Sequence, residues 1–196
     1  MTNLQLREAI DGILRRSQTA DAQATLLEEL RSALPHSIRP ARLGMFCEFP
    51  DGKIPEYDCF AFAFDLIDCP ERIAAEKYAP RRVGPTIQPG IADALPGPNF
   101  LQFLLLPEQP SFAACSDGDL VVYCDKFGNA RHAGKIVDGA IVSKWGMKGA
   151  LWQHDLWDVP SSYGLSAQFY SRRPKEYVRQ RWLVYLEHLA KRVRSR

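Results

Sequence analysis

A chain of 196 residues is long enough for one domain with its own hydrophobic core, and 25 basic against 23 acidic residues leave a net charge of only +2. Hydrophobic residues make up 46% of the chain and charged residues 24%, a composition that excludes collagen-like and disordered proteins. No apolar run approaches the roughly 20 residues of a membrane helix, so we expect no contact with a membrane. Residues 1–16 lack the apolar segment of a signal peptide, which predicts a cytoplasmic protein that only a dedicated system would export.

The first 35 residues predict a helical hairpin. Apolar residues recur at helical spacing in two runs, which are separated by the polar residues 17–21 and end at Pro35. These positions are Leu6, Ile10, Ile13 and Leu14 in the first run and Leu26, Leu27, Leu30 and Leu34 in the second. We expect the hairpin to pack on the rest of the protein or to contact a protein partner.

The middle of the chain contains an almost wholly apolar helix and a long irregular stretch. The helix is expected to run from Cys59 to about residue 68 and to be stopped by Pro70. Residues 80–98 hold five prolines and three glycines without periodicity, which predicts a loop that forms one wall of a cleft. The remaining elements expected here are a strand at 44–49, a turn at 50–52, and helices at 71–78 and 99–106.

The second half predicts an antiparallel sheet followed by one helix. The expected strands are residues 120–124, 131–137, 140–145, 150–154 and 165–170. Asp138-Gly139 is a strong signal for a two-residue hairpin turn between two of them. After Pro174, an apolar stripe predicts a closing amphipathic helix.

These elements predict an α+β fold with an antiparallel sheet of about five strands. We expect one compact unit of three parts: the hairpin 1–35, an α+β core 36–172 and the helix 173–196. The last part is basic, because residues 172–196 contain nine basic and two acidic residues. A solvated helix face explains this charge, and a protein partner is an alternative. Nucleic acid is not expected, because the charged face of the helix has no interleaved aromatic residues.

The cysteines predict neither disulfides nor a metal site. There are five of them, an odd number, and no two form a C-x-x-C pair. They are Cys47, Cys59, Cys69, Cys115 and Cys124. Most of them are expected to be reduced, buried and apolar in character, and no cofactor is expected.

Cys59 is the exception, because it lies where a helix N-terminus is predicted. The unpaired amides and the helix dipole at such a position favour a thiolate, so we expect a lowered pKa and a nucleophilic sulfur. The alternative is a structural cysteine in a buried apolar helix. His132, at the start of a predicted strand, is the candidate base, although a satisfied core histidine would give the same pattern.

The predicted hairpin places the neighbours of His132. If Asp138-Gly139 forms the turn, His132 lies opposite Trp145, and alternation puts both on the same face of the sheet as Ser143. Ser143 is then the diagonal neighbour that holds the His132 ring by a hydrogen bond, with Trp145 beside it. Lys135 and Lys144 are expected on the other face.

Three segments carry a family resemblance. They are Asp58-Cys59-Phe60-Ala61-Phe62, Gly118-Asp119-Leu120-Val121-Val122-Tyr123 and Arg131-His132-Ala133-Gly134-Lys135-Ile136. In type and order they resemble the NlpC/P60 superfamily of papain-like cysteine peptidases, over residues 56–146. The resemblance implies a papain-like core with Cys59 as nucleophile, His132 as base and amide bonds of peptidoglycan stem peptides as substrate.

Other residues depart from that family pattern. Ser143 stands where the family usually has a polar orienting residue such as histidine, asparagine or glutamine, and Phe60-Ala61 replaces Ser-Gly. His154 is an alternative orienting residue if its strand lies beside the hairpin, unless it is merely a partly exposed side chain. The oxyanion is expected to bind amides at the helix start, including that of Cys59, with Tyr57 as a further donor.

Three functions are consistent with these residues. The first is a cysteine hydrolase that cleaves an amide bond in a peptide or peptidoglycan fragment. The second is a catalytically silent member used as a binding or regulatory module, with the hairpin and the basic helix as contact surfaces. The third is an acyltransferase or thioesterase, which would need a long apolar channel lined by Phe60, Phe62 and Phe103.

Overall fold

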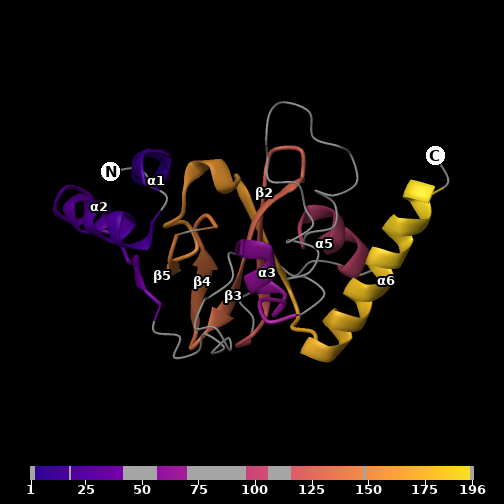
Figure 1. Ribbon diagram of the computed structural model, residues 1–196. Helices are drawn as coiled ribbons and strands as arrows, with labels where there is room; N and C mark the ends of the chain where they lie inside the picture. The colour runs from indigo at the N-terminus through magenta and orange to yellow at the C-terminus, as the bar shows by residue number, and fades with distance from the viewer. Residues whose placement is uncertain are drawn as a thin grey trace.

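The computed structural model describes residues 3–17, 19–41, 57–69, 96–105, 116–147 and 149–194, without the side chains of residues 190 and 192–194. The fold is α+β, with an open antiparallel sheet of six strands and five α-helices in the described part (Figure 1). The sheet order is β1-β5-β4-β3-β2-β6. The strands are β1 (Arg39–Pro40), β2 (Leu120–Cys124), β3 (Ala130–Val137), β4 (Ala140–Lys144), β5 (Leu151–His154) and β6 (Ser166–Tyr170). The five strands expected in the second half are confirmed, and β1 is an additional short edge strand.

Helices cover both faces of the sheet (Figure 1). Side chains alternate along β2, so Val121 and Tyr123 pack against the first two helices, whereas Val122 packs against the other three. The helices are α1 (Asn3–Arg16), α2 (Ala20–Ala33), α3 (Cys59–Ala63), α5 (Pro98–Leu105) and α6 (Lys175–Arg194). A 3₁₀ helix, η2 (Ser161–Tyr163), precedes β6. We call the two sheet faces the α1 face and the α3 face.

The predicted helices at both ends of the chain are confirmed. Leu6, Ile10 and Ile13 of α1 and Leu27 of α2 are buried, and α6 buries Val178, Trp182 and Tyr185. The helix expected at 99–106 is also present as α5. Among the described residues, no helix is long and apolar enough to cross a membrane. The predicted strand at 44–49, the turn at 50–52, the helix at 71–78 and most of the loop at 80–98 lie outside the described residues.

The predicted register of the β3–β4 hairpin is confirmed. Asp138 and Gly139 have φ angles of 50° and 73°, as a two-residue turn requires, and Val137 is paired with Ala140. The ladder continues to the pair of Gly134 and Ser143, where β4 is about to end. His132 therefore lies beyond the β4 ladder, on the part of β3 that pairs only with β2.

The predicted helix from Cys59 to about residue 68 is wrong in length, because α3 ends at Ala63. Asp65 has a φ of 57°, and the amide of Leu66 donates to the carbonyl of Ala61 at 3.0 Å, which is the hydrogen bond of a Schellman cap. The Asp65 carboxylate accepts from Lys135 Nζ on β3. This contact with the sheet holds the residue that ends the helix.

The segment around Asp119 links β2 to the start of α6. The Asp119 carboxylate accepts from the amides of Ser116 at 2.9 Å and of Arg172 at 2.6 Å. Gly118 has a φ of 92°, and the Arg172 side chain leaves no room for a Cβ there. A glycine and an acceptor are therefore needed at these two positions for structural reasons.

Candidate active site

Cys59 is the first residue of α3 and packs against β3. The helix is capped by Asp58, whose carboxylate accepts from the amide of Ala61 at 2.9 Å. The amides of Ala133, Cys59 and Phe60 interact with the sulfur and favour its thiolate form. Burial, followed by the nearby charge of Asp58, nevertheless raises the pKa of the Cys59 thiol well above its ordinary value. The expectation of a lowered pKa is therefore wrong, because burial outweighs the helix N-terminus.

His132 lies on the α1 face and is only 1% exposed. Within the described part of the chain, its Nε2 has no hydrogen-bond partner. Burial, followed by the neighbouring His154, lowers the pKa of His132 well below its usual value. The ring is therefore neutral at physiological pH and can accept a proton.

Tyr163 of η2 stacks on His132 and is near enough to Cys59 for an electrostatic influence. Its ring stacks on the His132 ring with centroids 3.7 Å apart and planes at 12°. Burial, followed by the charge of Cys59, raises the pKa of the Tyr163 hydroxyl. Ala133, whose amide interacts with the Cys59 sulfur, directly follows His132, so the thiol and the imidazole approach neighbouring residues of β3 from the two faces of the sheet.

Ser143 forms its hydrogen bonds with residues other than His132. Its Oγ lies 2.8 Å from His154 Nε2 and accepts from Trp145 Nε1 at 3.0 Å. His154 Nδ1 lies 2.9 Å from the carbonyl oxygen of Asp155, which can only accept. His154 therefore carries its proton on Nδ1, and the Ser143 hydroxyl donates to His154 Nε2. The prediction that Ser143 holds the His132 ring is wrong, because β5 places His154 within reach of that hydroxyl.

His154 is buried and close to His132. It is paired with Ile141 at the end of β5, beside the hairpin as expected, and is only 2% exposed. Burial lowers its pKa to about 4. The alternative of a partly exposed residue is thus excluded, and His154 is near enough to influence the pKa of His132 electrostatically. The described residues show no hydrogen bond between them.

The predicted neighbour Trp145 does not flank His132. Its ring lies 5.8 Å from that of His154 and 6.5 Å from that of Tyr163, measured between centroids. Tyr163 occupies the stacking position, and Tyr123 on β2 lies 5.8 Å from the His132 ring. An aromatic pair therefore holds the imidazole in place of the expected serine and tryptophan.

Tyr57 is buried on the α3 face beside Ala61 and Phe62. The Lys144 ammonium lies 4.9 Å from the centroid of its ring, and that of Lys135 lies 4.5 Å from the Phe62 ring. Both lysines therefore point away from the α1 face, as the register predicts. The role of Tyr57 as an oxyanion donor stays a prediction.

Sequence reasoning missed the two charged residues of α1 that position Tyr163. Arg7 donates to the carbonyl oxygens of Val159 at 3.2 Å and Pro160 at 3.3 Å and to that of Gly164. Asp11 accepts from Ser161 and from the amide and hydroxyl of Ser162. Both side chains are buried, so α1 holds η2 and the residues directly before and after it. The available signal was a pair of opposite charges beside the apolar stripe of a predicted helix.

Phe60, Phe62 and Phe103, whose lining of one channel would favour the acyltransferase or thioesterase, do not lie in one cluster. Phe60 packs with α5 and α6, whereas Phe62 belongs to the cluster around Tyr57. Phe103 packs at the edge of the first cluster, with the Arg181 guanidinium 4.3 Å from its ring centroid. Cys59, Cys69 and Cys124 are free thiols, and the described residues contain no group of side chains suited to hold a metal ion.

Comparison with known proteins finds no matching family model, no matching curated protein and no matching solved structure. The papain-like NlpC/P60 core inferred from residues 56–146 thus stays a prediction. What this end of β3 contains is a buried neutral imidazole with an aromatic ring stacked on it, and a thiol that interacts with backbone amides.

Proposed function

We propose that this protein is a cysteine hydrolase that cleaves an amide or ester bond, with Cys59 as nucleophile and His132 as general base. One observation carries the proposal: the amide of Ala133 interacts with the Cys59 sulfur, while the adjacent His132 has a buried ring nitrogen that no described residue pairs with. Buried polar atoms are rarely left without a partner unless they have a functional role. A neutral imidazole with a free nitrogen is suited to accept the proton of a thiol that comes within its reach.

The proposed reaction has two steps. Cys59 gives its proton to His132 as the sulfur attacks the carbonyl carbon, and the carbonyl electron pair moves to the oxygen, where helix-start amides bind it. The C–N or C–O bond then breaks, and His132 returns the proton to the leaving group. Water next attacks the thioester, loses a proton to His132 and releases the acid as the C–S bond breaks and the thiol is restored. Because burial raises the pKa of the thiol, the proton moves during attack instead of before it.

A papain-like NlpC/P60 core is part of this proposal. It is supported by the short helix that starts at the cysteine and packs on β3, the strand of the antiparallel sheet that carries the histidine. On that basis the amide bonds of peptidoglycan stem peptides are the first natural substrates to test. In this proposal the Tyr163 ring orients the His132 imidazole and replaces the polar orienting residue common in that family.

Acylation of Cys59 tests the proposal directly. The protein is incubated with p-nitrophenyl acetate or with a peptidoglycan stem peptide, and the thioester is located by peptide mass spectrometry. We expect Cys59 to be acylated in the wild type and acylation to fall at least tenfold in His132→Gln. The matched control is His188→Gln, which replaces an exposed histidine on α6 and should react like the wild type. Acylation of His132→Gln at the wild-type rate, or none at Cys59 with either compound, would refute the proposal.

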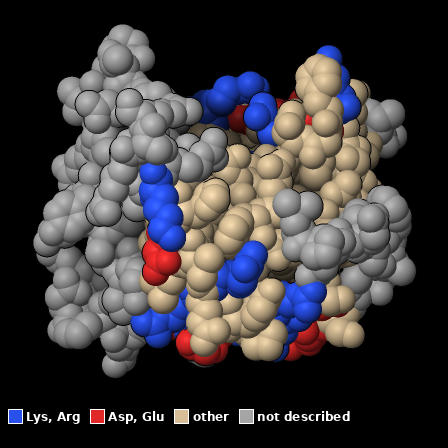
Figure 2. Space-filling view, turned by 90° about the vertical axis from the view of Figure 1, so that its right-hand side faces the viewer, with Lys and Arg blue, Asp and Glu red and all other residues tan. Residues whose placement is uncertain are grey.

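One observation favours the alternative of a silent binding module. His132 is 1% exposed and covered by the Tyr163 ring, and the Cys59 thiol is protonated at neutral pH. In that case partner binding would use outer surfaces and would survive Cys59→Ala. Figure 2 looks onto the side that carries α6, where Lys and Arg side chains are spread among uncharged ones together with Asp and Glu. Tyr177 and Val184 of α6 are exposed apolar residues there.

A further inference from the structure

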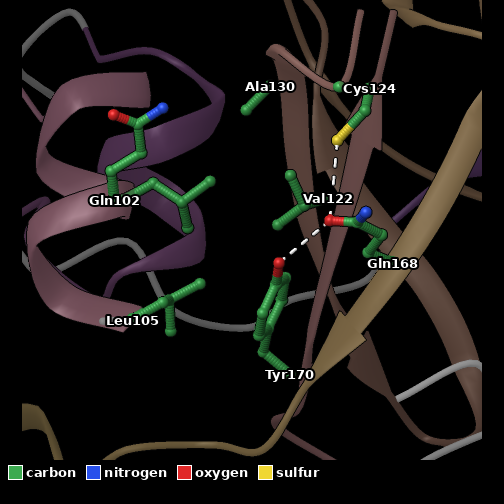
Figure 3. A pocket seen from close by; sticks show the side chains of 9 residues that line it. Gln102, Leu105, Val122, Cys124, Ala130, Gln168 and Tyr170 are labelled. Carbon is green, nitrogen blue, oxygen red and sulfur yellow. Dashed lines mark hydrogen bonds between the residues drawn. The ribbon is translucent and has the colours of Figure 1, made fainter. Parts of the chain in front are cut away.

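A pocket of about 340 Å³ lies between α5 and the α3 face of strands β2, β3 and β6 (Figure 3). Its walls are apolar where the helix faces the sheet. Leu101 and Leu105 line it from α5, and Val122 and Ala130 line it from the strands. A volume of this size is at the lower end of the range for small-molecule sites. Since a water occupies about 30 Å³ in the liquid, the space suits a group of roughly ten non-hydrogen atoms.

One side of the pocket is polar and uncharged. The Tyr170 hydroxyl donates to Gln168 Oε1 at 2.9 Å, and the Cys124 thiol lies 3.8 Å from the same oxygen (Figure 3). Among the described residues that line the pocket there is no Asp, Glu, Lys, Arg or His. Burial, followed by the charge of a neighbouring acid, raises the pKa of Cys124, and burial also raises that of Tyr170, so both are neutral at physiological pH. An ionised ligand group would therefore find no counter-ion here, whereas an apolar one would be accepted.

The pocket lies on the α3 face of the sheet, where Cys59 packs at the edge of the apolar cluster that contains Leu101, Leu105 and Val122. Val122, which lines the pocket, is the β2 partner of Ala133, whose amide interacts with the Cys59 sulfur. Further along β3, Lys135 contacts Phe62 in the later part of α3. The helix thus runs from Ala133 toward Lys135, and its cysteine end is directed toward Ala130 at the pocket.

We propose that this pocket binds the acyl part of the substrate whose carbonyl Cys59 attacks, and that it selects neutral, mainly aliphatic acyl groups. The assignment rests on the proposed function, since it needs Cys59 as the nucleophile. In this assignment the acyl side of the scissile bond, and not the leaving group, lies against the sheet. Acyl groups with a terminal carboxylate are rejected, because the pocket has no cation to pair with them.

Chain length and charge of the acyl group provide the kinetic test. The compounds are p-nitrophenyl acetate, p-nitrophenyl hexanoate and the mono-p-nitrophenyl ester of adipic acid. Burial of a methylene is worth roughly fourfold, so kcat/KM for the hexanoate should exceed that for the acetate by about two orders of magnitude, and the adipate should lose most of this gain. Ala130→Leu, which fills the pocket, should reduce the ratio of hexanoate to acetate at least tenfold. Ala22→Leu, the same change at an exposed site on α2, should not alter it.

Binding without reaction separates the pocket from the chemistry. In Cys59→Ser, ligand-observed NMR should detect binding of hexanamide but not of adipamic acid, and Ala130→Leu added to this variant should abolish it. If hexanamide binds in this way while no ester acylates Cys59, the pocket is confirmed and the proposed function alone is wrong. If esters acylate Cys59 with no preference for length and hexanamide does not bind, the pocket assignment is overturned and the hydrolase remains.

Discussion

The phenol ring of Tyr163 lies flat on the imidazole of His132, with centroids 3.7 Å apart and ring planes at 12°. Tyr163 belongs to η2, which is held in place because Asp11 of α1 binds Ser162 within it and Arg7 of α1 binds the carbonyl of Val159 just before it. The imidazole is therefore positioned by stacking instead of by a polar side chain. This contact also makes the N-terminal helix part of the support of the candidate site.

Two substitutions of Tyr163 should separate its ring from its hydroxyl. Tyr163→Phe keeps the stack, so the free energy of unfolding and the acylation rate of Cys59 should stay close to wild type. Tyr163→Ala removes the ring, which should lower the free energy of unfolding by about 2 to 4 kcal/mol and slow acylation at least tenfold. Urea denaturation and mass spectrometry of Cys59 measure the two effects. Wild-type stability and acylation in Tyr163→Ala would contradict a positioning role.

Loss of the buried guanidinium of Arg7 should destabilise the protein. Arg7→Met leaves the carbonyls of Val159, Pro160 and Gly164 without their donor, which we expect to lower the free energy of unfolding by about 2 to 4 kcal/mol. Arg16→Met on the same helix removes only an exposed bond to Gly12 and should cost less than about 0.5 kcal/mol. Urea denaturation of both variants provides the comparison. Equal midpoints for the two would show that the contacts between α1 and η2 contribute nothing.

The strands and the hairpin register could be predicted because their signals are local. Alternation of side chains and the Asp138-Gly139 turn determine which residues of β3 and β4 are paired. The end of α3 could not be predicted in this way. The apolar run continues past Ala63, and the helix ends where Asp65 contacts Lys135 of a distant strand. The support of His132 was missed for the same reason. It depends on contacts between α1 and η2, which are more than 150 residues apart.

The buried His154 should make the protein less stable as the pH falls. Its pKa is about 4 in the folded state and about 6.5 when unfolded, so between these values the unfolded chain binds more protons. The contribution of His154 to the free energy of unfolding is therefore fully present above its unfolded pKa and is lost as the pH falls toward 4. From pH 7 to pH 5 this one group should lower the free energy of unfolding by about 2 kcal/mol. The lowered pKa of His132 adds to the effect in the same direction.

Urea denaturation at pH 7 and pH 5 measures this dependence. His154→Gln should show a smaller loss of stability between the two pH values than the wild type, since glutamine does not titrate. His188→Gln removes an exposed histidine and should leave the loss unchanged. A wild-type pH dependence in His154→Gln would mean that this residue is not held neutral by burial.

Alkylation by iodoacetamide should reveal the raised pKa of Cys59. In the folded protein we expect slow reaction at pH 7 and a rate that still rises above pH 9, whereas the urea-unfolded chain should titrate near the ordinary value of about 8.5. Asp58→Asn removes the nearby negative charge and keeps a good N-cap residue, so alkylation at pH 8 should become several-fold faster. Asp21→Asn, in the first turn of α2, is the matched control and should have no effect. Peptide mass spectrometry distinguishes Cys59 from the other thiols, and faster alkylation in the folded than in the unfolded protein at pH 7 would show that the thiol is activated instead of suppressed.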